Sequence, residues 1–201
     1  ATVFPEAEQF IGIDINACHL AEARARLTTL PNTERISLQE GNFFKIQWSG
    51  ILGASAKKWL ILGNPPWVTS AELTILESDN HPQKNNFHGR PGIEAITGKS
   101  NFDISEWMLL QYLDWLKDRT GTIAVLCKTA IARKLLAQAW KERYPIKSAR
   151  LYAINAMEHF AAAVDACLFI IETDPNAASY DCAVFTSLDD RQPAHQLGFH
   201  N

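Results

Sequence analysis

Apolar and polar residues form short blocks along the chain, and the blocks predict strands and helices in turn. Gln9–Ile15 and Lys58–Leu62 are compact apolar runs of the kind found in strands, and Ile36–Leu38 is a shorter one. Between the first two, apolar residues recur at helical spacing over Ala17–Leu30, with Asn16 where a helix N-cap belongs. This alternation predicts an α/β sheet that is mostly parallel.

The second half of the chain predicts two helices and a strand hairpin. The helical segments are Phe102–Lys117 and Ala130–Tyr144. The strands expected here are, in order, Gly121–Cys127, Ala149–Ile154, Ala166–Glu172 and Cys182–Thr186. The segment between the second and third of them is too short for a typical crossover helix, which predicts an antiparallel C-terminal hairpin. The last strand is expected at the edge of the sheet.

Composition and charge limit the class of protein. The 201 residues are 47% hydrophobic and 20% charged, which fits one domain over residues 1–201 that needs neither disulfide nor metal. The net charge of −3 argues against a domain that coats nucleic acid by charge alone, but leaves room for a locally basic site. No apolar run approaches ~20 residues and no secretory signal is visible, so we expect no membrane span and a cytoplasmic location.

The four cysteines fit a reducing compartment. None lies at zinc-knuckle spacing from another, and the histidines show no metal-ligand spacing, so no metal site is expected. Three of the cysteines stand in apolar runs, which predicts buried thiols: Cys127, Cys167 and Cys182.

Three polar residues follow predicted strands. Asp14, Asn42 and Asn64 each stand at or just after a strand end. Ligands of parallel α/β sheets bind beyond the carboxyl ends of the strands, so we expect these side chains to line one cofactor cleft.

The segment Gly63-Asn64-Pro65-Pro66-Trp67 has a specific chemical interpretation. An amino group conjugated to a ring is a poor nucleophile, because its lone pair is delocalised. The Asn64 side-chain oxygen and the Pro65 carbonyl could accept its two hydrogens and free the lone pair, while Pro65 and Pro66 fix the backbone. Trp67 offers a flat face on which a base can stack. The competing interpretation is a proline-rich turn.

This motif resembles the catalytic motif of the adenine-N6 DNA methyltransferases of restriction–modification systems. The resemblance covers most of residues 9–172. It implies a Rossmann-like methyltransferase sheet, S-adenosylmethionine as cofactor, and DNA as partner with the target adenine flipped out of the duplex. It also implies that Asn64, Pro65, Pro66 and Trp67 are catalytic, with Asn64 bordering the cofactor as well.

Two further segments resemble the family's cofactor motifs. Asp14 and Ile15 lie in a segment similar to the one whose acid binds the ribose hydroxyls; Asp14 could instead cap the following helix. Asn42 and Phe43 resemble the motif whose acid binds the adenine amino group of the cofactor and whose aromatic residue packs on that ring. Asn42 replaces the usual acid and would accept a weaker hydrogen bond, or it could be a turn residue.

The remaining resemblances are less specific. Phe160 stands where the family places an aromatic residue on the target base, although a core phenylalanine is an equal alternative. His159 is expected to be a surface residue, and Lys128, at a strand end, is expected to be a solvated lysine that could reach a phosphate. The polar, glycine-containing loop Asp79–Asn101 carries several basic residues, and we expect it to lie near the active site and to close on DNA.

The family's first motif, a glycine-rich loop after the first strand, is not found before Asp14. We therefore expect a catalytic domain cut at its N-terminal side, with a recognition domain or subunit elsewhere. The alternatives are an amino-methyltransferase acting on protein glutamine or on RNA, and an inactive methyltransferase-fold fragment.

Overall fold

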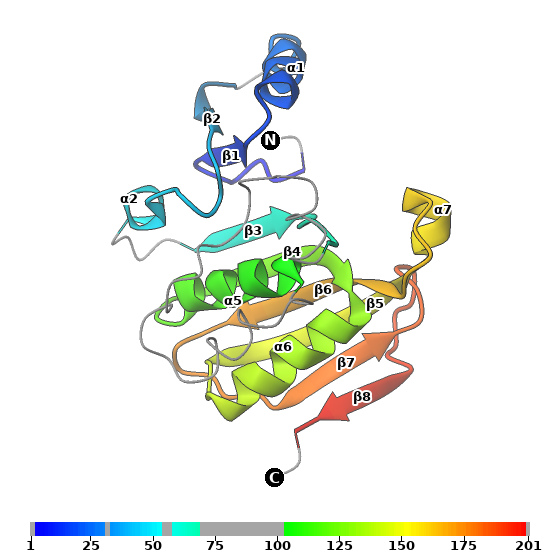
Figure 1. The fold of residues 1–201 in the computed structure, drawn as a ribbon. Helices are drawn as coiled ribbons and strands as arrows, with labels where there is room; N and C mark the ends of the chain where they lie inside the picture. The colour runs from blue at the N-terminus through cyan, green and yellow to red at the C-terminus, as the bar shows by residue number, and fades with distance from the viewer. Residues whose placement is uncertain (1–2, 31–32, 54–57, 69–102, 200–201) are drawn as a thin grey trace. The chain divides into compact units, whose positions relative to one another are not determined.

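The computed structural model describes residues 3–30, 33–53, 58–68 and 103–199 (Figure 1). The chain divides into two compact units: the described residues up to Gly53 form the first, and those from Lys58 onward form the second. The predicted loop Asp79–Asn101 lies outside the described residues. The single domain over residues 1–201 stays a prediction.

The first unit is a parallel strand pair with a helix in the connection. Its elements are β1 (Phe10–Asp14), α1 (Ala17–Leu27), a 3-10 turn (Thr33–Arg35), β2 (Ile36–Glu40) and α2 (Trp48–Leu52). Asp14 and Glu40 face each other at the carboxyl ends of β1 and β2. The side chain of Asn16 accepts a hydrogen bond from the Cys18 amide (2.9 Å), which confirms Asn16 as the N-cap of α1.

The second unit is built on a six-stranded sheet in the order β3-β4-β6-β5-β7-β8. Its strands are β3 (Trp59–Gly63), β4 (Gly121–Lys128), β5 (Ile146–Ile154), β6 (Ala166–Thr173), β7 (Asp181–Phe185) and β8 (His195–Gly198). The pairs β3/β4 and β5/β7 are parallel, while β6 is antiparallel to both β4 and β5, and β8 is antiparallel to β7. Hence β3, β4, β5 and β7 run in one direction, which confirms the mostly parallel sheet with an antiparallel hairpin.

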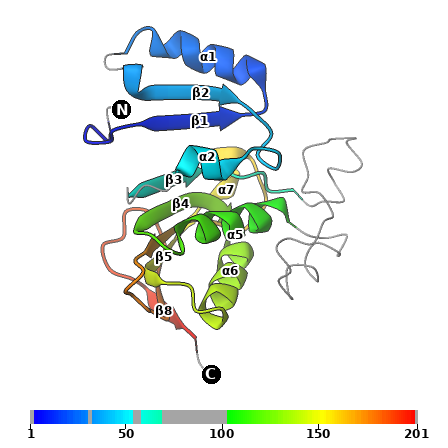
Figure 2. The same cartoon turned by 90° about the vertical axis from the view of Figure 1, so that its left-hand side faces the viewer.

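Two helices cover one face of this sheet (Figure 1 and Figure 2). They are α5 (Ile104–Leu116) and α6 (Thr129–Lys141). The side chains of β4 alternate between buried and half-buried, with Ile123, Val125 and Cys127 fully buried. The three cysteines predicted to be buried, Cys127, Cys167 and Cys182, are buried, whereas Cys18 is exposed.

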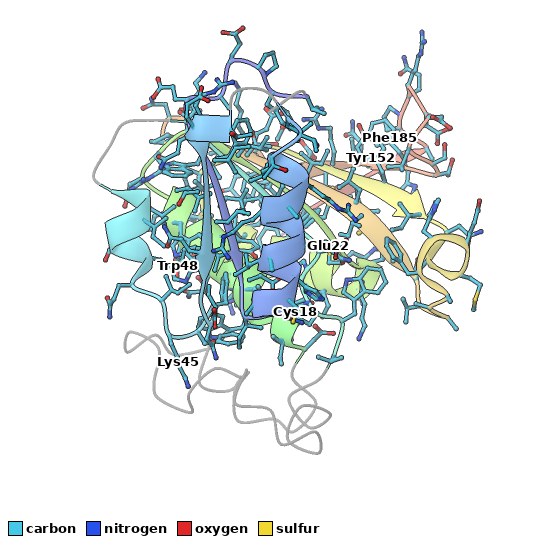
Figure 3. The ribbon with its side chains drawn as sticks, turned by 90° about the horizontal axis from the view of Figure 1, so that it is seen from above. Cys18, Glu22, Lys45, Trp48, Tyr152 and Phe185 are labelled. Carbon is cyan, nitrogen blue, oxygen red and sulfur yellow. The ribbon has the colours of Figure 1, made fainter. Side chains whose placement is uncertain are left out.

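One strand lies elsewhere in the sheet than the sequence predicts, and some short elements have no counterpart among the predicted ones. β7 was expected at the sheet edge, but β8 pairs with its outer side. β8 is short and its residues are largely exposed, so it has no apolar run to mark it. Tyr152 of β5 and Phe185 of β7 stack with ring centroids 4.3 Å apart (Figure 3). The helix α7 (Ala156–Phe160), between β5 and β6, was also missed because it has only five residues.

Two carboxylates are buried in the first turn of α5, and each has a cationic partner. Asp103, the N-cap, is bound by Lys128 at 2.9 Å, and Glu106 by Lys134 at 2.7 Å. Burial raises the pKa of the Glu106 carboxyl, and the ammonium group of Lys134 offsets part of that rise. An apolar helix can therefore pack on the sheet while it carries two charges in its buried first turn.

Removing the partner of Glu106 should destabilise the second unit in a pH-dependent way. We expect Lys134→Met to lower the free energy of unfolding at neutral pH by about 1–3 kcal/mol, the usual effect of leaving a buried polar group without its partner. A raised folded-state pKa means that protonation favours the folded protein, so the loss should shrink as the pH falls towards the ordinary pKa of a glutamate. Urea unfolding at several pH values measures this.

The matched control is Lys134→Met combined with Glu106→Gln. Glutamine has no charge to leave buried, so the double variant should regain most of the lost stability at neutral pH. If the single and double variants lost equal stability, Lys134 would not be compensating for the buried charge of Glu106.

The end of α7 offers a second stability prediction. Ala161 has a left-handed backbone (φ 51°, ψ 31°), a conformation that glycine adopts without strain. Ala161→Gly should raise the free energy of unfolding by about 0.5–1 kcal/mol. Ala162→Gly is the control, because Ala162 does not have a positive φ and should gain nothing. Thermal unfolding of both variants tests the difference.

Candidate active site at the carboxyl ends of the strands

The Asn-Pro-Pro-Trp segment leaves the sheet directly at the end of β3. Gly63, the last residue of β3, pairs with Val125 of β4, and the next residues continue beyond the ladder. Pro65 is buried and Asn64 is exposed. In the part of the chain that the structure describes, no hydrogen bond to the Asn64 side chain is found. The segment thus presents an open amide next to a rigid, anchored proline.

Trp67 is fixed against the sheet and against α7. Its indole N–H donates to the Leu126 carbonyl at 3.4 Å, and its ring meets the Phe160 ring edge-on, with centroids 5.5 Å apart. Phe160 is 43% exposed, so it is not a core residue. The structure therefore brings together two of the predicted site residues from opposite halves of the chain.

The geometry of this ring pair restricts what it can hold. A flat base between two parallel rings needs centroids about 7 Å apart, which is two contact distances of ~3.5 Å. The Trp67 and Phe160 rings lie closer than that and at 75° to each other. A base can stack on one of the rings as they stand, and it can lie between them only after Phe160 moves.

Phe160 reaches this position because of the short helix that carries it. Asn155 caps α7 through the Glu158 amide (3.3 Å), and Ala161 ends it in the left-handed conformation. Met157 and Val164, on and just after α7, are also exposed (56% and 37%). An exposed apolar group thus surrounds the end of α7.

In the first unit, the structure brings Asp14 next to the segment of Asn42. The Gly41 amide donates to the Asp14 carbonyl at 3.0 Å, immediately beyond the β1/β2 pair. The Asp14 carboxylate accepts from the Asn16 amide (2.7 Å), and its second oxygen lies 3.6 Å from the His19 imidazole. Its side chain is 41% exposed. Because Asn16 caps α1, the carboxylate of Asp14 is not the helix cap.

Asn42 has a local role in the turn. Its side-chain oxygen accepts from the Phe44 amide at 2.9 Å, and its carbonyl accepts from Lys45. Phe43 packs against the Trp48 ring at 4.9 Å and receives the Trp48 indole N–H on its carbonyl. The interpretation of Asn42 as a turn residue is therefore confirmed.

Asn64 belongs to the second unit, whereas Asp14 and Asn42 belong to the first. Asp14 and Asn42 share one sheet edge, and Asn64 follows the corresponding end of β3. A single cleft lined by all three stays a prediction.

Lys128 corrects an expectation from sequence. Its ammonium is bound to the buried Asp103 carboxylate, and its side chain is 26% exposed, so it is not a solvated lysine. The sequence shows an aspartate before a helical segment and a lysine at a strand end, but it does not show that the two side chains meet. His19, beside Asp14, was also missed; its signal is its place in the first turn of α1.

Two further findings concern the described residues alone. None of the helices there is long and apolar enough to cross a membrane. Nor do these ranges contain a group of three histidine, cysteine or acidic side chains that could hold a metal ion.

Comparison with known proteins gives one relative by sequence and several by structure. No family model matches the chain. The chain is 37% identical, over 98% of its length, to the type II methyltransferase M.NspV of Nostoc sp., and spans 41% of that protein. It therefore covers less than half of this relative.

Two solved structures share the fold. One is the methyltransferase subunit of a type I restriction–modification system from Streptococcus thermophilus (TM-score 0.50, 15% identity, 88% of this chain and 35% of that one). The other is the type IIL restriction–modification enzyme MmeI in complex with DNA (TM-score 0.52, 15% identity, 96% and 27%). The chain is thus similar in sequence to a type II methyltransferase over almost its whole length, and it shares its fold with two proteins of restriction–modification systems.

Proposed function

We propose that the protein transfers a methyl group from S-adenosylmethionine to the N6 amino group of adenine in DNA. The observation that carries the proposal is the Asn-Pro-Pro-Trp segment, which leaves the end of β3 with an exposed Asn64 and with Trp67 against Phe160. The similarity to a type II methyltransferase supports DNA as the substrate. With such a substrate, we place the activity in the cytoplasm.

In this mechanism the chain supplies two hydrogen-bond acceptors for the adenine amino group. The Asn64 side-chain oxygen and the Pro65 carbonyl accept its two hydrogens, which draws the nitrogen towards tetrahedral geometry and localises its lone pair. Asn64 is exposed and Pro65 is buried, so an accessible acceptor stands next to one that the buried proline ring holds in place. The nitrogen would then attack the methyl carbon of the sulfonium directly, with a neutral thioether as the leaving group and one amino proton lost to solvent, so no covalent enzyme intermediate is required.

Trp67 and Phe160 hold the base in this proposal. An adenine inside a duplex hides its amino group from a deep pocket, so the base must be flipped out. Stacking on an aromatic ring compensates for part of the lost stacking in the duplex. The partly exposed Phe160 lies at the end of a five-residue helix, so it is the ring that we expect to move when the base enters.

The residues of the first unit fit an adenosyl cofactor. The half-exposed carboxylate of Asp14 can accept from both ribose hydroxyls, and the exposed Ile15 offers an apolar surface beside it. Asn42 stands in the turn that follows β2, and Phe43 supplies an aromatic ring for the adenine. When bound, the sulfonium cofactor supplies the methyl group.

The first functional prediction concerns Asn64. Asn64→Ala in the intact protein should lower the single-turnover rate of adenine methylation by about 10²–10³, the usual effect of removing one preorganised hydrogen-bonding group at a reacting centre. Cofactor binding should be retained. A rate within a few-fold of the unmutated protein would mean that this segment is not the catalytic centre. Transfer to a glutamine peptide or RNA, with none to DNA, would select the alternative substrates.

The second functional prediction concerns Asp14. Asp14→Ala should weaken S-adenosylmethionine binding by about 1–3 kcal/mol, measured by calorimetry, because a charge-assisted hydrogen bond is lost. Glu22→Ala is the matched control: this carboxylate is exposed on α1 and pairs with Arg26, away from the strand ends. Equal affinities for the two variants would remove Asp14 from the cofactor site.

A further inference from the structure

We propose that the Asp103–Lys128 ion pair is a clamp that positions the catalytic segment 64–68 on the end of β4. The inference rests on the proposed function, because it concerns the geometry of that same segment. Neither residue touches the reacting atoms in this proposal. Both are positioning residues that act through the backbone of Val68.

The segment 64–68 is held at both ends, but by different means. At its start, Gly63 is paired with Val125 in the β3/β4 ladder. At its end, the Val68 carbonyl accepts a hydrogen bond from the Ile104 amide at 3.1 Å. Ile104 is the first residue of α5 and lies far from Val68 in sequence, so the place of α5 determines where the segment ends.

Asp103 fixes the start of α5 with one oxygen and binds Lys128 with the other. Its Oδ1 accepts from the Ser105 amide (3.0 Å) and hydroxyl (2.5 Å), which is the N-cap interaction. Its Oδ2 accepts from the Lys128 ammonium at 2.9 Å. The side chain of Asp103 is only 7% exposed, so water competes weakly for this bond.

Backbone hydrogen bonds hold Lys128 in place. It is the last residue of β4 and pairs with Ala166 of β6. The next residue, Thr129, donates its amide to the Asp165 carbonyl at 2.9 Å. β4 also carries Leu126, whose carbonyl receives the Trp67 indole N–H. The contacts therefore form a closed ring: β3, the catalytic segment, the start of α5, the ion pair, and β4 beside β3.

The chain provides a matched comparison one turn further along α5. Glu106 is as buried as Asp103 and binds Lys134 of α6 at 2.7 Å. This second pair joins two helices, and its described contacts do not include the segment 64–68. Breaking either pair leaves a buried carboxylate without its partner, but only one break releases the catalytic segment.

The kinetic test uses the intact protein with Lys128→Met and Lys134→Met. Lys128→Met should lower the kcat of methyl transfer by about 10–100-fold, because small displacements of reacting groups cost rates of this order. Its Kd for S-adenosylmethionine should stay within about threefold of the unmutated value. Lys134→Met should keep its kcat within a few-fold.

Three further variants test the clamp if Lys128→Met folds poorly. Asp103→Asn keeps a capping oxygen but loses the charge, so it should match Lys128→Met, and the double variant should be no worse than either single one. Lys128→Arg keeps the charge and should regain part of the kcat. If the losses of kcat from the two single variants added up in the double variant, the clamp would be overturned.

A readout that is independent of methylation separates this inference from the proposed function. Hydrogen exchange of the Ile104 amide, the donor to Val68, should accelerate in Lys128→Met and not in Lys134→Met. Equal exchange in the two variants would overturn the clamp, as would a loss of kcat with unchanged exchange. If the unmutated protein methylates no DNA, the proposed function fails, and the exchange experiment still decides the clamp.

Discussion

The ladder between β4 and β6 is the constraint on which the second unit depends. All eight residues of β4, from Gly121 to Lys128, pair in register with β6. Because β6 runs antiparallel between β4 and β5, its first residue lies at the same sheet edge as the last residues of its neighbours. The connection from β5 to β6, with Phe160, is thereby delivered beside Trp67. A parallel β6 would start at the opposite edge.

Much of the fold could be predicted from sequence, because its strands and helices differ in period and in length. The run Gly121–Cys127 and the helical pattern that starts at Phe102 are strong signals of this kind. α7 and β8 are too short to show a period, and β8 has no apolar run, with Leu197 as its one large apolar residue. Their positions come from tertiary pairing: β8 from its ladder with β7, and α7 from the hairpin that it interrupts.

The candidate site was predictable where chemistry dictates residue type, and less so where packing decides. Asparagine followed by two prolines limits the backbone so strongly that Asn64 and Pro65 stand out from sequence alone. Lys128 does not, because a lysine at a strand end is usually solvated. Its partner Asp103 comes close only when α5 packs on the sheet, and no local pattern encodes that contact.

The cysteines of the second unit have a practical consequence. Cys127 and Cys167 face each other across β4 and β6 with their sulfurs 4.0 Å apart, and this contact, together with burial, raises the pKa of the Cys127 thiol. Burial also raises the pKa of Cys182 to about 12. Thiolates are the species that react with alkylating reagents, so these buried thiols are protected from alkylation while the sheet is folded. Cys18 is exposed in the folded protein, so its alkylation provides an internal reference against which the slower alkylation of the buried thiols reports unfolding.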